Sequence, residues 1–439
     1  MRHTPGKALP KSFPLCYHSR KIRTNPDNLR QSPEQSGQKR RTTRRPESGD
    51  PMTEMVYGTA PVREGEPVLP KWWRTVDRWA LSCILMLFGV GILLGLAASP
   101  PLAERNGLAH FHYVQRQAFF GALALTVMLF TSTLSPTVVR RIAVIAFAGA
   151  FLALLGLPFL GTDFGKGAVR WYSLGFASVQ PSEFLKPVFV VVAAWMMAAS
   201  QEIGGPPGKL WSFGLTVTIV LILALQPDFG QACLVLFGWG VMWFVAGAPM
   251  MLLVGLAGLV VMGGMVAYNG SEHFARRIDG FLTPEVDPRT QLGYATNAIQ
   301  EGGFFGVGVG EGQVKWSLPD AHTDFIIAVA AEEYGLILVL VIIALYTVVV
   351  VRSFLRLMRE RDPFIRLAGT GLAAMFGVQA MINMGVAVRL LPAKGMTLPF
   401  VSYGGSSLIA GGLAVGMLLA LTRSRPQGEI GEILRARGR

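Results

Sequence analysis

The sequence predicts an all-α integral membrane protein with about ten transmembrane helices and a large extracytoplasmic loop before the eighth. Two observations carry this prediction. Hydrophobic residues make up 51% of the chain and charged residues only 15%, and several apolar runs approach the roughly 20 residues that a helix needs to cross about 30 Å of hydrocarbon. A soluble domain cannot bury that much apolar surface in one core. The run Phe325–Val351 is also longer than a buried helix of a very apolar soluble protein.

Residues 1–74 form a polar, proline-rich and basic segment, which we predict to be a disordered cytoplasmic tail. The segment has no apolar stretch of the kind that a secretory signal peptide requires. Met52 begins a shorter, plausible chain, so residues 1–51 are a candidate mis-called start. The intact mass of the natural product tests this hypothesis, because a product that begins at Met1 contradicts it.

Apolar spans follow one another within a membrane domain that we place at residues 75–425, and residues 426–439 form a second cytoplasmic tail. Glycine and proline recur within the spans, which membrane helices tolerate. The predicted spans are Trp79–Ala98, Gln117–Leu134, Ile142–Leu160, Phe184–Ser200, Leu210–Leu225, Ala232–Ala246, Met250–Tyr268, Phe325–Val351, Ile365–Val388 and Ser406–Leu421.

Lysine and arginine in short loops predict the orientation, because these residues collect on the cytoplasmic side of a membrane protein. An even number of spans puts both termini on one side, and that side should be the cytoplasm of a multi-pass inner-membrane protein. Its basic residues are Lys71, Arg74, Arg78, Arg140, Arg141, Lys209, Arg352, Arg356, Arg359, Arg361, Arg366, Arg423 and Arg425.

The opposite, extracytoplasmic side holds four substantial segments, at Pro100–Arg116, Gly161–Glu183, Asn269–Asp324 and Arg389–Gly405. The third has roughly fifty residues, which is typical of a functional loop rather than a simple connector.

Positive charge on this extracytoplasmic side breaks the orientation rule. Arg170, Lys186 and Lys394 stand at boundaries between a loop and a helix, which favours an anionic ligand, because arginine matches phosphate geometry and lysine supplies a point charge. Contact with lipid headgroups is the alternative for any single residue. The other basic residues of this side are Lys166, Arg276, Arg277, Arg289, Lys315 and Arg389.

The net charge of +13 does not indicate a nucleic-acid partner, because the basic residues do not form a face on a folded domain. The cysteines Cys16, Cys83 and Cys233 have neither disulfide nor metal-ligand spacing. His322 has no second histidine or cysteine at ligand spacing, so no metal site is assigned to it. It is a candidate substrate-binding residue, and the alternative is a hydrogen bond that shapes its loop.

Asp324 is the candidate catalytic residue. It precedes the longest apolar run, where the dipole of a helix N-terminus would keep a carboxylate ionised at the membrane surface. An ordinary N-cap is the alternative, since aspartate is favoured at such positions, and both roles can coexist.

Three glutamates and one further aspartate are candidates for supporting roles. Glu332 and Glu333 lie within the same apolar run, at helical positions that favour bracing the bundle over contact with the substrate at Asp324. Glu183 and Lys186 are three residues apart at a helix start and can pair. Asp228 lies in a short turn between two middle spans. The glycines of 302–310 do not follow a strand, which favours a sharp backbone turn or tight packing over a phosphate-binding loop.

Four blocks of sequence resemble the SEDS family (shape, elongation, division and sporulation), and the resemblance runs from about Trp79 to Arg425. The blocks before the eighth and tenth spans are the most specific. The blocks are Gly167–Trp171 together with Gln180–Lys186, Gln226–Gly230, Pro319–Ile326, and Leu391–Ser407.

The resemblance implies a peptidoglycan glycosyltransferase that polymerises lipid II, a disaccharide-pentapeptide on undecaprenyl diphosphate, into glycan strands on the extracytoplasmic face. The essential loop aspartate of the family falls on Asp324. Its essential basic pair falls on Arg170 and Lys186, and a loop tryptophan of known importance falls on Trp171. Lys394-Gly395 resembles the cell-division branch, which implies a role at the division septum.

The chain departs from the pattern of the family at two positions. Arg389 stands where a small or uncharged residue is common, and Tyr172 stands where an aliphatic residue is usual. Neither position carries a catalytic assignment, but Arg389 could alter how the outer cavity meets its substrate.

The resemblance also implies partners: a class B penicillin-binding protein that crosslinks the new strands, and other proteins of the division machinery. Mg²⁺ or Mn²⁺ is a candidate cofactor at the diphosphate. Two rival functions stay open, a lipid II flippase with a polar path along Glu332, Glu333 and Asp228, and a non-catalytic scaffold of the division machinery.

Overall fold

The computed structural model describes residues 67–163, 169–175, 177–270, 272–282, 290–318, 320–392 and 395–424. Most of the two predicted tails therefore lies outside the described residues. The end of the N-terminal tail is described, and there Val68–Thr75 forms helix α1.

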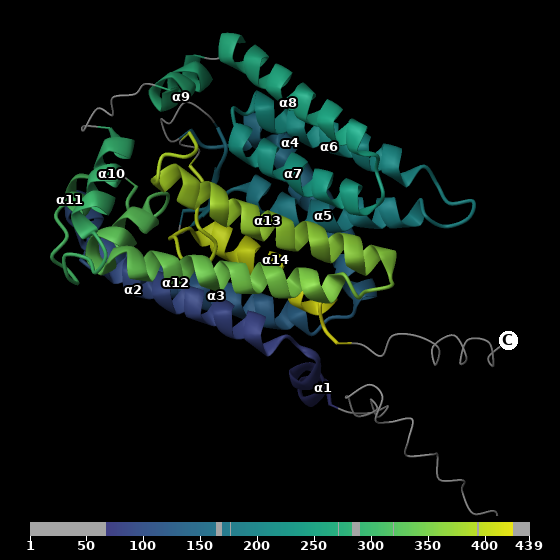
Figure 1. The fold of residues 1–439 in the computed structure, drawn as a ribbon, viewed down its shortest axis with the longest axis horizontal. Helices are drawn as coiled ribbons and strands as arrows, with labels where there is room; N and C mark the ends of the chain where they lie inside the picture. The colour runs from purple at the N-terminus through teal and green to yellow at the C-terminus, as the bar shows by residue number, and fades with distance from the viewer. Residues whose placement is uncertain are drawn as a thin grey trace, which may run out of the picture. The chain divides into compact units, whose positions relative to one another are not determined.

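The described chain is almost entirely helical (Figure 1). A two-residue hairpin, β1 and β2, pairs Tyr172 with Val179 and Ser173 with Ser178 in antiparallel register. The elements after α1 are α2 (Arg78–Arg105), α3 (His112–Ser132), α4 (Pro136–Leu160), β1 (Tyr172–Ser173), β2 (Ser178–Val179), α5 (Pro181–Ala199), α6 (Gly208–Leu225), α7 (Phe229–Val245), α8 (Met250–Gly270), α9 (Glu272–Leu282), α10 (Gln291–Gly302), α11 (Val314–Ser317), α12 (Ile326–Leu357), α13 (Pro363–Ala387) and α14 (Gly405–Leu421).

The prediction of an all-α membrane protein is confirmed. Among the described residues, seven helices (α2, α3, α4, α5, α6, α12 and α13) are long and apolar enough to cross a bilayer, or up to eight if α8 and α9 form one span bent by 110°. The helices α7 and α14 are shorter apolar helices. Each predicted span falls on one of these helices. An apolar run forms a helix in a bilayer because its backbone N–H and C=O groups find no water there and must hydrogen-bond to each other.

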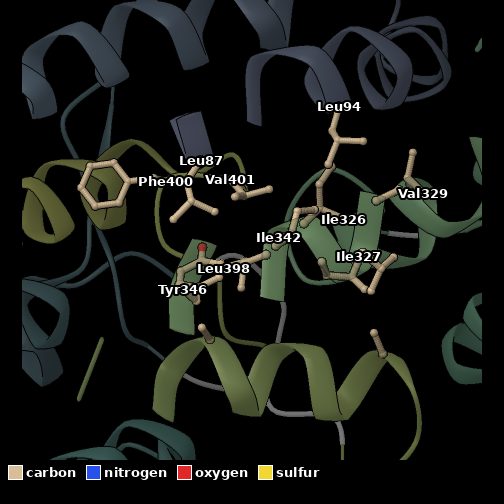
Figure 2. Close-up of a cluster of buried hydrophobic side chains, with 14 of the residues drawn as sticks. Leu87, Leu94, Ile326, Ile327, Val329, Ile342, Tyr346, Leu398, Phe400 and Val401 are labelled. Carbon is tan, nitrogen blue, oxygen red and sulfur yellow. The ribbon is translucent and has the colours of Figure 1, made fainter. Parts of the chain in front are cut away.

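The helices α5 and α13 are the most buried of the membrane helices and form the centre of the bundle. One buried hydrophobic cluster joins α5 and α13 to α4, α6 and α7. A second cluster joins α2 and α12 to the chain at residues 398–401. Figure 2 shows Leu87 and Leu94 of α2, Ile326 of α12, and Phe400 and Val401 of that segment within this second cluster.

Basic residues at one end of the bundle bind backbone carbonyls and one buried aspartate. Asp77 accepts from the Nε atoms of Arg352, at 3.1 Å, and Arg356, at 2.8 Å. Arg356 also donates to the carbonyl of Thr422, and Arg423 donates to that of Thr133. This end therefore ties together α2, α3, α12 and α14. We name the other end, which carries the described parts of segments 161–180, 226–228, 271–325 and 388–404, the loop end.

Two features of the loop end differ from the sequence prediction. The first span was expected to end at Ala98, but α2 continues through Pro100 and Pro101 to Arg105. The extension buries Ala103 and bonds Arg105 to the carbonyl of Trp316, and this packing outweighs the two prolines. The long apolar run is also not one regular helix, because Gly335 has φ 74° and ψ −174° and breaks α12.

Candidate active site

Arg170 is held against the turn between α6 and α7. Its Nε donates to the carbonyl of Gln226 at 3.1 Å, and its Nη2 donates to that of Pro227 at 2.8 Å. These bonds stabilise carbonyls at a helix C-terminus, where a cation is favourable. They use two positions of a guanidinium group that carries five N–H donors. Arg170 is therefore fixed in place while its charge lies at the loop end.

The β1–β2 hairpin positions Arg170 and the residue that follows it. The carbonyl of Trp171 accepts from the backbone N–H of Thr162 at 2.9 Å, and Trp171 is half-buried. The unusual Tyr172 donates its hydroxyl to the carbonyl of Ala153 in α4 at 2.7 Å. Gly156 leaves room for this hydroxyl, because a Cβ there would lie 2.9 Å from it. Tyr172 thus anchors the hairpin to α4.

Asp228 lies buried in the α6–α7 turn, beside the carbonyls that Arg170 binds. Its Oδ2 accepts from Nε2 of Gln180 at 3.2 Å. Burial raises the pKa of the Asp228 carboxyl above its ordinary value, and the positive charges of Arg170 and Lys186 oppose this rise. Arg170 and Lys186 therefore both lie close enough to Asp228 to lower its pKa.

Lys186 of α5 belongs to a buried cluster of polar side chains from α5, α7 and α13. Its Nζ donates to Oε2 of Glu183 at 2.8 Å and to Oε1 of Gln379 at 3.3 Å. The other oxygen of Glu183, Oε1, accepts from Gln231 at 2.6 Å. Glu183 therefore compensates the charge of Lys186, and the i,i+3 spacing that suggested a pair in the sequence does bring the two together.

A small cavity opens beside this ion pair, between α5, α13 and α14. Glu183, Lys186, Gln379 and Ser407 supply its polar wall. The rest of the wall is apolar, and includes Leu372 and Phe376 of α13 and Ala410 and Ala414 of α14. The cavity therefore has one polar side, at the Lys186–Glu183 pair, and one apolar side.

The backbone around Asp324 is fixed at three successive carbonyls. The N–H of Tyr403 donates to the carbonyl of His322, the hydroxyl of Ser402 donates to that of Thr323, and Nδ2 of Asn383 donates to that of Asp324. Asp324 itself is half-buried. The structure therefore fixes the backbone that carries the candidate catalytic residue, which favours a preorganised site.

Asp324 is not the N-cap of α12, which was the alternative in the sequence. Phe325 occupies the N-cap position, and no side chain forms the cap hydrogen bond there. Asp324 instead belongs to the turn before the helix, where its N–H donates to the carbonyl of Asp320 at 3.1 Å.

Lys394 lies outside the described residues, but its neighbour Gly395 is described. A Cβ on Gly395 would lie 3.5 Å from Oδ2 of Asp324, so the chain at this point passes directly beside the carboxylate. His322 packs its ring against Tyr113 and Tyr403, with centroids 5.5 Å apart in both cases. His322 thus lies in an aromatic group formed by α3, the long loop and the segment before α14.

Two amides of α13 connect the separate parts of the site, and the sequence reasoning did not select them. Gln379 accepts from Lys186 and donates to the carbonyl of Thr397 at 3.1 Å. One turn further, Asn383 donates to the carbonyl of Met396 at 2.6 Å as well as to that of Asp324 at 3.0 Å. The available signal was their i,i+4 spacing in an otherwise apolar span, where polar side chains are costly and functional by default.

Glu332 and Glu333 bind the long loop and not the group around Lys186. Glu332 accepts from the N–H groups of Val314 and Lys315, at 2.6 and 3.2 Å, at the start of α11. Glu333 accepts from Nζ of Lys315 in a pair that is almost fully buried. Both glutamates therefore hold the loop against the first half of α12.

The described residues contain no group of three or more histidine, cysteine, aspartate or glutamate side chains that could hold a metal ion. The site offers the carboxylate of Asp324 on a fixed turn, positive charge at Arg170 and Lys186, and a small cavity with a polar and an apolar side. These are the groups needed to deprotonate a hydroxyl next to an anionic leaving group.

Comparison with known proteins gives one consistent family. The family model FTSW_RODA_SPOVE, described as "Cell cycle protein", matches residues 78–427. The chain is 43% identical over 365 residues to "Probable peptidoglycan glycosyltransferase FtsW" of Caulobacter vibrioides, covering 83% of this chain and 93% of the relative. It is 36% identical to the protein of the same name from Trichlorobacter lovleyi, covering 79% and 93%.

Solved structures show the same fold. A structure titled "Structural coordination of polymerization and crosslinking by a peptidoglycan synthase complex" matches with a TM-score of 0.64 and 29% identity, over 79% of this chain and 97% of that chain. The rod shape determining protein RodA of Thermus thermophilus matches with a TM-score of 0.58 and 28% identity, over 81% and 99%.

Proposed function

The chain belongs to the SEDS family, to which FtsW and RodA belong, and we propose that it is the peptidoglycan glycosyltransferase that polymerises lipid II during cell division. The observation that carries the proposal is the fixed backbone of Asp324. Asn383 of α13 bonds to the carbonyls of Asp324 and Met396, and the chain at Gly395 passes beside the Asp324 carboxylate. One turn earlier in α13, Gln379 bonds to Lys186.

In the proposed reaction, Asp324 accepts the proton of the acceptor 4-hydroxyl as that oxygen attacks the anomeric carbon of the lipid-linked donor. The bond from the anomeric carbon to the diphosphate oxygen breaks, and undecaprenyl diphosphate leaves. A positioned base contributes about 10²–10⁴-fold to such a step. Positioning would supply a further part, because hydrogen bonds to three successive carbonyls fix the backbone turn that carries Asp324.

We propose that Arg170 and Lys186 bind the diphosphate as it leaves. Arg170 keeps N–H donors beyond the two that bind the α6–α7 turn. Lys186 lies at the polar wall of the cavity, beside Glu183. Trp171, His322 and Lys394 would complete the substrate contacts.

If a divalent cation, Mg²⁺ or Mn²⁺, takes part, the Asp324 carboxylate would help to hold it. Magnesium is commonly held by one or two carboxylates together with substrate phosphates. The cation would supply additional positive charge to the leaving group.

We propose that the loop end faces the extracytoplasmic side of the inner membrane, with both termini in the cytoplasm, and that the protein acts at the division septum. The proposed crosslinking partner is a class B penicillin-binding protein, together with other division proteins. Support comes from the basic residues at the opposite end and from the solved peptidoglycan synthase complex of the same fold.

Asp324→Asn tests the proposed base. In purified full-length protein with lipid II, with the partner and Mg²⁺ supplied, we expect polymer formation to fall at least 100-fold while lipid II binding and thermal stability stay near those of the native protein. Glu311→Gln, an exposed carboxylate of the same loop, is the matched control and should retain activity. If the Asp324→Asn variant formed nearly normal amounts of polymer, Asp324 would not be the base.

The native protein also distinguishes the rival function. If it moved lipid II across the membrane and formed no polymer, the result would favour a flippase.

A further inference from the structure

The segment Gly302–Gly310, which we name the glycine finger, lies against the break in α12. The N–H of Val307 donates to the carbonyl of Glu332 at 2.9 Å, on one side of Gly335. On the other side, the N–H of Leu336 donates to the carbonyl of Gly303 at 3.0 Å. The finger thus supplies hydrogen-bond partners to the N–H and C=O groups that lose their helical partners at the break. Non-helical backbone in a membrane protein requires such partners.

Glycine is required where the finger meets the helix. A Cβ on Gly302 would lie 1.8 Å from the carbonyl oxygen of Ala331, and one on Gly306 would lie 2.2 Å from that of Glu333. Gly335 is equally tight, since its Cβ would lie 2.3 Å from the carbonyl oxygen of Phe304. The depth of the finger along α12 is therefore fixed by backbone contact.

Burial along α12 changes at the break. Every residue from Ile326 to Glu333 is buried by protein, whereas Leu336 and Ile337, directly after the break, are 39% and 48% exposed. From Leu336 to Arg352 the helix rises about 24 Å, slightly less than the roughly 30 Å of bilayer hydrocarbon. The break thus lies at the edge of the hydrocarbon on the side of the loop end.

The finger exposes large apolar side chains at this depth. Phe304, Phe305 and Val309 are 68%, 81% and 68% exposed, and the exposed carboxylates Glu301 and Glu311 bracket the apolar stretch. Phenylalanine and other large apolar side chains enter the boundary between the headgroups and the acyl chains of a bilayer, where they leave water.

We propose that the glycine finger inserts Phe304 and Phe305 into the leaflet on the side of the loop end, and so anchors the long loop to the bilayer. The insertion is independent of the reaction proposed above. Its ligand is the acyl-chain and glycerol region of phospholipids, and not a protein partner, because the finger is at the same depth as the lipid-facing residues Leu336 and Ile337.

Spin labels on the full-length chain in phospholipid vesicles test this placement. Single cysteines at Phe305, Ile337 and Glu311 are placed in a background with Cys16, Cys83 and Cys233 changed to alanine. The spin label at position 305 should collide with oxygen several times more often than with a water-soluble nickel chelate, as should the label at the lipid-facing control position 337. The ratio should reverse at the control 311, which lies in the same loop.

A label at 305 that behaves like the one at 311 would overturn the proposal. A label shielded from both reagents would also overturn it, because another protein surface would then cover the finger. The native chain provides a second measurement without substitution. A phospholipid with a photoreactive acyl chain should label residues 304–309, and a lack of labelling there alongside labelling of 336–341 would contradict insertion.

Discussion

Asn383 is the residue whose contacts bear most directly on the proposed catalysis. It is 2% exposed, its Nδ2 bridges the carbonyls of Asp324 and Met396, and its Oδ1 has no hydrogen-bond partner among the described residues. The amide thus couples the position of the carboxylate to the segment before α14. We consider it a positioning residue, since it acts through Asp324.

Replacing Asn383 with leucine should lower kcat about tenfold with little change in KM. Each lost hydrogen bond is worth about 0.5–1.5 kcal/mol, and about 1.4 kcal/mol corresponds to a factor of ten in rate. The matched control is Gln117→Leu. Gln117 is also 2% exposed and bridges two carbonyls, those of Gly91 and Val401, but it does not contact the Asp324 turn. Equal losses of kcat in two variants of similar thermal stability would show that Asn383 has only a structural role.

Single residues show how far sequence reasoning reaches at this scale. The pairing of Glu183 with Lys186 followed from an i,i+3 spacing, which is a local property of a helix. The contacts of Gln379 and Asn383 join positions 13 to 193 residues apart, and no local spacing encodes them. The sequence marked these amides only as polar exceptions in an apolar span.

At the scale of elements, hydropathy located every membrane span but not the break in α12. Gly335 sits within a long apolar run, and a change of φ leaves hydropathy unchanged. The short helices α10 and α11 were likewise absent from the prediction. Their position depends on Glu332 and Glu333, whose carboxylates bind the start of α11 and Lys315 from α12. Figure 1 shows α10 and α11 at the loop end, near the start of α12.

The Lys315–Glu333 pair should stabilise α11 through compensation of charge. Both side chains are at least 95% buried, so removing one partner leaves a buried charge, which costs about 3–5 kcal/mol. We expect Lys315→Met and Glu333→Leu each to lower the melting temperature in detergent, and the double variant to recover much of the loss. A double variant that is less stable than either single variant would contradict this compensation.

At the scale of the whole molecule, the two ends of the bundle use charge in different ways. At the loop end, positive charge is combined with carboxylates and a cavity, in the group formed by Arg170, Lys186, Glu183 and Asp228. At the opposite end, arginines bind one buried aspartate and helix C-terminal carbonyls, which fastens the helices together. The charge pattern in the sequence separated the two ends, although it could not show which basic residues meet.

The proposed orientation predicts which end a membrane-impermeant thiol reagent reaches in intact cells. Two exposed glutamates provide matched sites: Glu311 in the long loop and Glu202 between α5 and α6 at the opposite end. In the cysteine-free background, we expect Glu311→Cys to react and Glu202→Cys to react only after the inner membrane is permeabilised, because the basic residues at the opposite end favour the cytoplasm. The reverse pattern would place the loop end in the cytoplasm. The candidate site would then lie on the opposite side of the membrane from an extracytoplasmic substrate, and this result alone would contradict the proposed polymerase.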